Sequence, residues 1–429
     1  MKAKPRPPPP ADARTLPARF YLDDVVFDRE LDRIFGRMWI CAGRAEAVSQ
    51  GGRYFVREIG RESVIVVSDR DGVLRAVFNV CRHRGTRICT EPNGRFGETI
   101  QCPYHAWTYA LDGRLVGAPH MDNVPGFDRA EYPLHPVGLD TWDGHIFINL
   151  DAGRRSPAPI HAGGATGTPT SRQDSAFGGG ALRQAQGPTS EGAHVREAQG
   201  AAARASQGSR PGSLMDQLAD LPEKFRAWQM RDLRSAARIV YDVRANWKLI
   251  IQNYSECLHC PVIHPALERL SHYLSGENEP PTPAYLGGRM DLRDGVETIS
   301  VDGRRVGACL PGLDAADRGR VYYYAVFPNL LLTLHPDYVM THTLWPRRCD
   351  RTEIVCEWHF HPARMAQPDF TSDEAVRIWD ETNRQDWHVS ELSQLGIQSR
   401  VYAPGPYSDR EDLLYAFDKM IVNIVDGQP

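Results

Sequence analysis

One stretch of sequence decides both the fold and the chemistry of this chain: N-W-K-L-I-I-Q-N-Y-S-E-C-L-H-C-P-V-I-H-P, residues 246–265. Glu256 stands three residues before His259, and side chains three apart on a helix lie on one face. His264 follows His259 by five residues, and five helical steps leave the two side chains about 140° apart. Both histidines reach one centre only if the helix is interrupted between them, and Pro261 is placed to interrupt it.

Two histidines and a carboxylate are the ligand set with which many proteins hold non-haem iron. The stretch therefore favours an iron site that includes His259 and His264. The competing interpretation is that both histidines only pack in a core or lie on a surface. The stretch alone leaves both interpretations open.

Length and composition limit the class of protein. The 429 residues are enough for two or three domains with large cores, and a formal net charge of −4 predicts no nucleic-acid partner. No apolar run approaches the length of a membrane span, and the Pro-rich N-terminus lacks the apolar core of a secretion signal. We expect a cytoplasmic protein that does not enter a membrane.

Nine cysteines are spread unevenly along the chain, which is not the pattern of a disulfide framework. In a reducing compartment, clustered cysteines and histidines bind metals more often than they form bridges. Cys257 and Cys260 form a C-x-x-C around His259. They are expected to pack beside the iron site without binding zinc or taking part in redox chemistry.

The first half of the chain falls into four segments by composition. Residues 1–18 are Pro-rich and predict a disordered tail, and residues 19–39 carry an amphipathic helix over 27–39. Residues 40–151 alternate short β-rich runs with turn signals, as in a small antiparallel β domain. Residues 152–212 are rich in Gly, Ala, Ser and Gln and predict a disordered low-complexity insertion. The expected turns are Asp71-Gly72, Asn93-Gly94, Asp112-Gly113 and Asp143-Gly144.

Residues 213–429 mix strands and helices, which predicts an α+β domain. A long amphipathic helix is expected from about Ser372 to Leu395. Strands are expected over Val321–Phe327, Leu330–Leu334 and Ile354–Phe360.

Two short loops of the β domain each supply one cysteine and one histidine: Cys81 with His83, and Cys102 with His105. Such a set suits a structural zinc, or a [2Fe–2S] cluster with two thiolates on one iron and two imidazoles on the other. Zinc knuckles more often pair two cysteines in one loop, so the mixed pairing favours the Rieske type of cluster. Gly85 would let the chain bend after the first loop.

The motifs C-R-H-R-G, C-P-Y-H-A-W and N-W-K-x-x-x-Q-N-Y-x-E-C-x-H-C-P-x-x-H-P occur in this order. From about residue 21 to 417, apart from 152–212, the chain resembles the catalytic α subunits of Rieske non-haem iron oxygenases, the ring-hydroxylating family. The resemblance implies an antiparallel β Rieske domain and a helix-grip catalytic domain. It implies cluster ligands and iron ligands at matching positions: Cys81, His83, Cys102 and His105 for the cluster, His259 and His264 for the mononuclear Fe(II).

In this family the third iron ligand is an aspartate on a late helix, for which Asp373, Asp380 and Asp386 are candidates. The stretch T-N-R-Q-D-W, followed by G-I-Q-S-R-V-Y-A-P-G-P, resembles the family's pattern most closely when Asp386 is the ligand. We expect Asp386, and the sequence leaves the choice against Asp380 open. The competing interpretation is a solvated carboxylate on a helix face.

Glu256 matches the position of the carboxylate that links subunits in this family. The resemblance implies that it joins His105 of a neighbouring subunit to His259, orienting both rings and providing a short path for electrons. Many members have aspartate here. Glutamate in an E-C-L-H-C-P context is similar to the branch that acts on quaternary ammonium compounds such as glycine betaine, carnitine and stachydrine.

The function implied is an oxygenase that uses O2 and electrons passed from NAD(P)H by a separate flavin/iron–sulfur reductase to hydroxylate a small organic substrate. The most specific expectation is oxidative N-demethylation of a quaternary ammonium compound such as glycine betaine, by a homotrimer. Alternatives are an aromatic-ring hydroxylating dioxygenase, a Rieske electron carrier without oxygenase activity, and a zinc-stabilised binding protein. A carrier would need no second iron, so residues 246–265 argue against it.

Several aromatic residues could cage a methylammonium group by cation–π attraction. Core packing explains each of them equally well, and no choice among them is made. His359 and His361 alternate along an expected strand and are predicted to be structural. The aromatic candidates are Tyr322, Tyr323, Tyr324, Trp345, Trp358 and Trp387.

Overall fold

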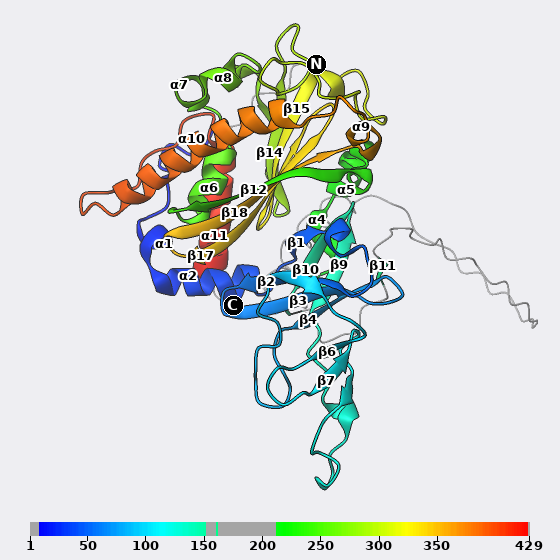
Figure 1. Ribbon diagram of the computed structural model, residues 1–429. Helices are drawn as coiled ribbons and strands as arrows, with labels where there is room; N and C mark the ends of the chain where they lie inside the picture. Colours follow the sequence, from blue (N-terminus) through cyan, green and yellow to red (C-terminus); the bar gives the residue numbers. More distant parts are fainter. Residues whose placement is uncertain (1–7, 152–159, 162–211, 428–429) are drawn as a thin grey trace, which may run out of the picture.

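The computed structural model describes residues 8–151, 160–161 and 212–427 and has two parts, a small lower β domain and a larger α+β domain (Figure 1). Every strand pair is antiparallel. Among the residues that it describes, no helix has the length and apolarity to cross a bilayer. The helices and helical turns are α1 (Arg19–Leu22), α2 (Asp24–Glu30), η1 (Leu31–Phe35), η2 (Ala45–Val48), η3 (Arg129–Glu131), α4 (Leu214–Leu218), α5 (Leu221–Lys224), η5 (Arg226–Trp228), η6 (Met230–Asp232), α6 (Trp247–Tyr254), α7 (Cys260–Ile263), α8 (Pro265–Glu268), η7 (Tyr273–Ser275), η8 (Asp317–Gly319), α9 (Pro362–Met365), α10 (Asp373–Ile397) and α11 (Asp412–Asp426).

The strands of the lower part form three sheets, in the orders β1-β10-β9, β11-β4-β3-β2-β5 and β6-β7-β8, and those of the upper part form one sheet of seven, β12-β18-β17-β16-β15-β14-β13. Their bounds are β1 (Ile40–Arg44), β2 (Arg53–Ile59), β3 (Glu62–Ser68), β4 (Val73–Phe78), β5 (Asn93–Arg95), β6 (Thr99–Gln101), β7 (Thr108–Ala110), β8 (Leu115–Gly117), β9 (Gly138–Trp142), β10 (His145–Asn149), β11 (Ile160–His161), β12 (Arg234–Val243), β13 (Glu277–Asn278), β14 (Tyr285–Asp291), β15 (Arg320–Val326), β16 (Leu330–Leu334), β17 (Val339–Arg348) and β18 (Arg351–Phe360).

The predicted α+β fold with a small antiparallel β domain is confirmed, and one predicted turn is wrong. Asn93-Gly94 does not reverse the chain but lies in β5, where it pairs with Phe55 and Tyr54 of β2. The reason for the glycine is a close approach, because a Cβ on Gly94 would lie 2.8 Å from the Tyr54 hydroxyl oxygen. The glycine of Asn93-Gly94 therefore indicates close packing between two strands and does not indicate a turn.

The long helix predicted over 372–395 is confirmed as α10, which lies across the seven-stranded sheet (Figure 1). Its acidic first turn suits the positive end of the helix dipole. One stripe of side chains, spaced three and four apart, faces inward: Ala375, Ile378, Trp379, Thr382, Asn383, Trp387, Ser390, Gln394 and Ile397.

The opening stretch is interrupted, but not where the sequence predicted. Helix α6, which Asn246 caps through its side chain, ends at Tyr254, so the interruption precedes His259. Pro261 lies in the first turn of α7, where a missing N–H costs nothing, and thus begins a helix instead of ending one. As a result, His259 and His264 cap opposite ends of the four-residue helix α7.

Two boundary predictions need correction. Arg14 forms a β-bridge with Pro406, and Leu16, at 2 % exposure, packs in the main core, so residues 8–18 are not a disordered tail. The amphipathic helix begins earlier than predicted, at Asp24, because the Asp23 side chain caps it. Most of the insertion predicted at 152–212 lies outside the described residues; within it, β11 pairs with β4.

A buried ion pair ties the N-terminal helices to α6. Lys248 Nζ lies 2.6 Å from Glu30 Oε1, and both side chains are fully buried. The Trp247 indole donates to the other oxygen of Glu30 at 2.8 Å. Burial lowers the pKa of Lys248 and raises the pKa of Glu30, so each charge depends on the other for compensation.

Candidate active site

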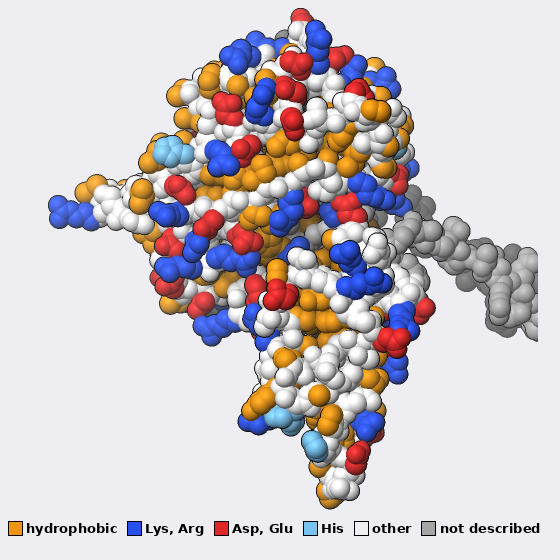
Figure 2. Space-filling view, in the orientation of Figure 1, with side chains coloured by type: hydrophobic (Ala, Val, Ile, Leu, Met, Phe, Trp, Pro, Cys, Tyr) orange, Lys and Arg blue, Asp and Glu red, His pale blue; other side chains and the backbone are white. Residues whose placement is uncertain are grey.

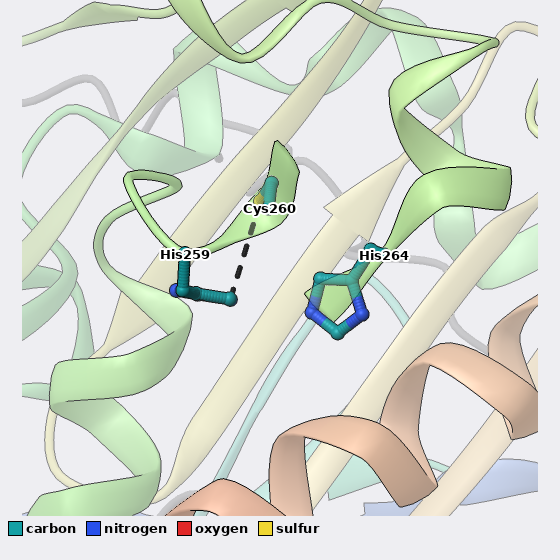
Figure 3. Close-up of side chains that lie close together, drawn as sticks. All are labelled: His259, Cys260 and His264. Carbon is teal, nitrogen blue, oxygen red and sulfur yellow. Dashed lines mark hydrogen bonds between the residues drawn. The ribbon is translucent and has the colours of Figure 1, made fainter. Parts of the chain in front are cut away.

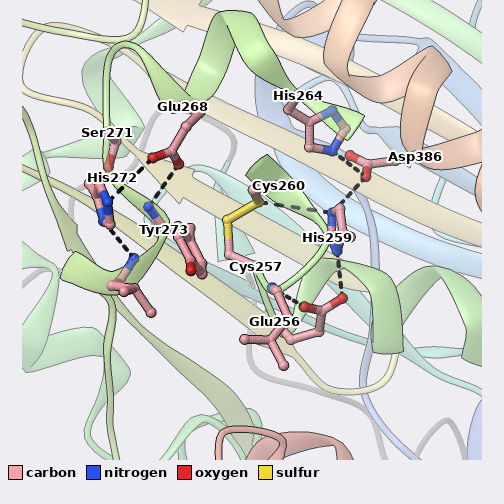
Figure 4. The surroundings of a disulfide bond; sticks show 12 residues. Glu256, Cys257, His259, Cys260, His264, Glu268, Ser271, His272, Tyr273 and Asp386 are labelled. Atoms are coloured by element: carbon pink, nitrogen blue, oxygen red, sulfur yellow. Dashed lines mark hydrogen bonds and ion pairs between the residues drawn. A yellow bond between two sulfur atoms is a disulfide. The ribbon is translucent and has the colours of Figure 1, made fainter. Parts of the chain in front are cut away.

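Three predicted iron ligands meet between α7 and α10 (Figure 4). Asp386 Oδ1 lies 2.8 Å from His264 Nε2 and 3.2 Å from His259 Nε2. His264 is 1 % exposed, whereas His259 and Asp386 keep 18 % and 17 % of their side-chain surface exposed. All three line one cavity. The structure thus brings together the set named from the sequence.

The outer nitrogen of each ring is held by an oxygen. His259 Nδ1 lies 2.5 Å from Glu256 Oε1, and His264 Nδ1 lies 2.7 Å from Gln385 Oε1. Because a carboxylate oxygen and an amide oxygen only accept, each Nδ1 donates, and each Nε2 is left as the nitrogen that lies beside Asp386 and can bind a metal. An oxygen acceptor on the ring nitrogen that faces away from the metal is typical of metal-binding histidines. Gln385 was missed from the sequence, although it directly precedes Asp386.

The electrostatics of the three groups also suit a cation. Burial by itself lowers the pKa of His259, but its hydrogen bonds to Asp386 and Glu256 outweigh burial and raise the pKa to about 10. Burial raises the pKa of Asp386, and the two histidines outweigh it and lower that pKa. A carboxylate that is held ionised between two imidazole nitrogens fits a divalent iron, which all three groups can bind.

The other two candidate aspartates are engaged elsewhere. Asp380 Oδ1 accepts from the Tyr241 hydroxyl at 2.8 Å, and its Oδ2 pairs with Arg384 at 3.0 Å. Asp373 is exposed at the first turn of α10. Asp386 alone of the three stands beside the histidines.

Cys257 and Cys260 lie beside the histidines as expected, but a disulfide that the sequence did not predict joins them (Figure 4). The non-helical backbone between α6 and α7 brings their Cα atoms to 5.0 Å, within the range that a bridge requires. Figure 3 shows Cys260 close to both histidines, and the ligand atoms of the three residues lie within 4.8 Å of one another. A bridged sulfur is not a thiolate, so the oxygen of Asp386 is the better third donor.

The two cluster loops of the lower domain are built alike. Cys81 and Cys102 are buried, and each accepts a backbone hydrogen bond from the residue four positions later, Gly85 or Ala106. Both later residues have positive φ, 73° at Gly85, which confirms the predicted bend.

His83 and His105 lie side by side on the outer side of these loops. Their ring centroids are 4.7 Å apart, His83 is exposed, and Figure 2 shows histidines on the surface of this domain. Burial raises the pKa of the Cys81 thiol, whereas His83 is exposed and His105 is half-buried. Two buried sulfurs and two outer imidazoles fit a cluster with one iron bound by thiolates and the other by histidines.

The cavity above the histidines is walled by aromatic rings, and its empty space is about 1120 Å3, part of it open to solvent. Ring contacts 5.9–6.4 Å long link successive members of this aromatic wall, which we define as Trp379, Tyr323, Tyr254, His342 and Trp387. Of the aromatic residues singled out in the sequence, Tyr323 and Trp387 line the cavity. Trp345 and Trp358 belong to the core, and His359 is buried in β18, in agreement with the prediction for it.

Comparison with known families agrees with both halves of the chain. The Rieske [2Fe-2S] domain model matches residues 38–128, and the model of the ring hydroxylating alpha subunit (catalytic domain) matches residues 230–427. The chain belongs to the Rieske oxygenases. It is therefore an oxidoreductase whose cofactors are a Rieske [2Fe–2S] cluster and a mononuclear iron, and whose electrons come from a reductase. The electron-carrier and zinc-protein alternatives are wrong.

Three individual proteins resemble this chain. The chain is 28% identical over 423 residues to the glycine betaine monooxygenase oxygenase subunit of Pseudomonas aeruginosa, covering 92% of this chain and 85% of that protein. It is 35% identical over 256 residues to the carnitine monooxygenase oxygenase subunit of Escherichia coli, covering 60% and 54%. Its fold is similar to the crystal structure of the quaternary ammonium Rieske monooxygenase CntA, with a TM-score of 0.71, 23% identity and 97% and 96% coverage.

Proposed function

We propose that this oxygenase removes an N-methyl group from a quaternary ammonium compound of the kind represented by glycine betaine and carnitine. O2, two electrons and two protons convert N–CH3 into N–CH2OH and water. The C–N bond of this carbinolamine then breaks, which releases formaldehyde, a proton and a tertiary amine. The electrons come from NAD(P)H through the reductase.

The observation that carries this proposal is the aromatic wall of the cavity. Ring faces attract a methylammonium cation, and the attraction grows when the site excludes water. Among the described residues that line the cavity, the carboxylates are Glu256 and Asp386, and both are engaged with histidines. A cation in this cavity is therefore recognised by rings, which also leaves its methyl carbons beside the iron ligands.

The geometry described above supports two metal sites. We infer that His259, His264 and Asp386 hold the mononuclear iron, and that Cys81, His83, Cys102 and His105 hold the cluster. Bound iron supplies open positions where O2 is activated next to the substrate. The protein orients the imidazoles through Glu256 and Gln385 and encloses the substrate between α10 and the sheet.

We further propose that the active unit is a homotrimer in which Glu256 joins two subunits. The cluster loops lie in the lower domain and α7 at the far end of the upper one (Figure 1), which supports a path from the cluster of a neighbour to this iron. Apolar side chains are exposed at both ends: Leu258 and Val262, 36 % and 81 % exposed, beside Glu256, and Tyr104, 57 % exposed, beside His105. Such patches are typical of contact surfaces.

A Glu256→Gln variant tests this electron path. Glutamine keeps an oxygen acceptor for His259 Nδ1 but removes the charge that would hold the neighbour's His105. We expect normal iron content and a cluster that is reoxidised by O2 and substrate roughly 10- to 100-fold more slowly. Stopped-flow absorbance of the cluster measures this rate.

Glu374→Gln is the matched control, because the Glu374 side chain pairs with Arg377 on the surface of α10, away from the histidines. This variant should be reoxidised at the wild-type rate. A Glu256→Gln variant as fast as wild type would show that electrons do not pass through this residue.

A single turnover tests the function itself. The holoenzyme is reduced chemically without air, mixed with glycine betaine, carnitine or stachydrine, and then exposed to O2, which removes the need for the reductase. We expect formaldehyde in an amount close to the active sites present, and none without substrate. Oxygenated products from aromatic compounds alone would overturn the proposal and establish the dioxygenase alternative.

A further inference from the structure

One member of the aromatic wall, His342 of β17, has a nitrogen that nothing in the described chain uses. His342 is 1 % exposed and lines the cavity. Its Nε2 lies 3.2 Å from Asn383 Oδ1, and its Nδ1 is buried without a hydrogen-bond partner among the described residues. An unpaired buried nitrogen is costly, so its partner is expected to be something the cavity binds.

A chain of hydrogen bonds decides which nitrogen of His342 carries the proton. The Asp380 carboxylate, paired with Arg384, accepts from the Tyr241 hydroxyl at 2.8 Å. The Tyr241 oxygen is then free to accept from Asn383 Nδ2, which lies 3.4 Å away. Asn383 therefore turns its Oδ1 to His342, so Nε2 of His342 is the donor and Nδ1 carries the lone pair.

Trp387, the neighbour of His342 in the aromatic wall, carries a donor of its own. Its indole nitrogen is also buried without a partner among the described residues, and it lines the same cavity. The two rings are perpendicular, with centroids 5.9 Å apart. Burial lowers the pKa of His342 to about 4, so the ring is neutral near pH 7. The aromatic wall thus holds an acceptor on His342 and a donor on Trp387, besides the unpaired Tyr323 hydroxyl, and a substrate hydroxyl that reaches the first two satisfies both.

Position distinguishes His342 from other buried histidines with an unpaired nitrogen. His359 has the same pattern, with Nε2 3.0 Å from Thr341 Oγ1 and Nδ1 without a partner. His335 has two unpaired nitrogens. Neither residue lines the cavity, so no substrate can satisfy their nitrogens.

We propose that His342 Nδ1 accepts a hydrogen bond from a hydroxyl group of the substrate, to which the Trp387 indole donates, so that the enzyme selects a hydroxyl-bearing quaternary ammonium compound. This inference rests on the proposed function and narrows its substrate class. Both side chains are specificity determinants.

Two compounds that differ by one hydroxyl provide the test: L-carnitine and γ-butyrobetaine, which lacks it. Isothermal titration of the holoenzyme measures the Kd of each. We expect wild type to bind carnitine roughly 10- to 100-fold more tightly, because the deoxy compound leaves both buried groups unpaired. His342→Phe keeps a ring in the wall but removes the acceptor, and should reduce this ratio to near one.

His359→Phe is the matched control, and it should leave the ratio unchanged. Trp387→Phe, which keeps a ring but removes the donor, should lower the ratio even if His342→Phe does not fold. Equal binding of the two compounds to wild type, or an unchanged ratio in His342→Phe, would overturn the inference alone. If neither compound bound, the proposed function would fail as well.

Discussion

An Asp386→Ala variant is expected to keep the visible absorption of its Rieske cluster and to lose its mononuclear iron. Alanine removes the carboxylate oxygen that lies between His259 Nε2 and His264 Nε2, and two imidazoles alone do not complete the facial set. Iron content should fall from about three atoms per chain to about two, since the cluster holds two. Single-turnover formaldehyde should disappear with it.

Asp380→Asn is the control for this result. Asp380 lies six residues earlier on α10 and holds Tyr241 and Arg384 instead of the histidines. Asparagine keeps an acceptor for the Tyr241 hydroxyl, so this variant should retain all of its iron. Metal analysis and the visible spectrum are measured on the same samples. An Asp386→Ala protein with unchanged iron content would show that the third ligand lies elsewhere.

A Lys248→Met variant is expected to be among the least stable single variants of this protein. Methionine fills most of the lysine's volume but leaves the carboxylate of Glu30 fully buried without its cation. Breaking such a pair from one side costs about 3–5 kcal/mol. Circular dichroism during urea unfolding, compared with wild type, measures the loss.

Two further variants separate the charge from the packing. The double variant Glu30→Gln with Lys248→Met removes both charges and should regain most of the lost stability, because a neutral amide still accepts from the Trp247 indole. Arg377→Met breaks an exposed pair with Glu374 and should change stability by less than about 1 kcal/mol. A Lys248→Met protein as stable as wild type would show that the pair is not needed.

Most residues of the candidate site lie close together in the sequence and could be predicted from it. The two cluster loops and the segment from Glu256 to His264 are local patterns, in which each ligand lies within a few residues of the next. Local backbone geometry places such side chains together whatever surrounds them, and the family resemblance named them without a structure. The strands and α10 could be predicted equally well, because the alternation of apolar residues in strands and their helical spacing are local periodicities.

Other features depended on how distant segments meet. The choice between Asp386 and Asp380 is made by the rotation of α10 against α7, which turns one carboxylate to the histidines and the other to Tyr241. Gly94 was misread because the ring it accommodates comes from another strand.

The sequence also did not predict the disulfide between Cys257 and Cys260 or the role of His342. The bridge forms because the helix ends at Tyr254, five residues before His259, which no composition rule predicts. His342 has no motif around it; its free nitrogen exists only because Asn383, Tyr241 and Asp380 orient it from two other elements. A local pattern reports which residues can bind, whereas packing between distant elements decides which atom of each side chain faces the cavity.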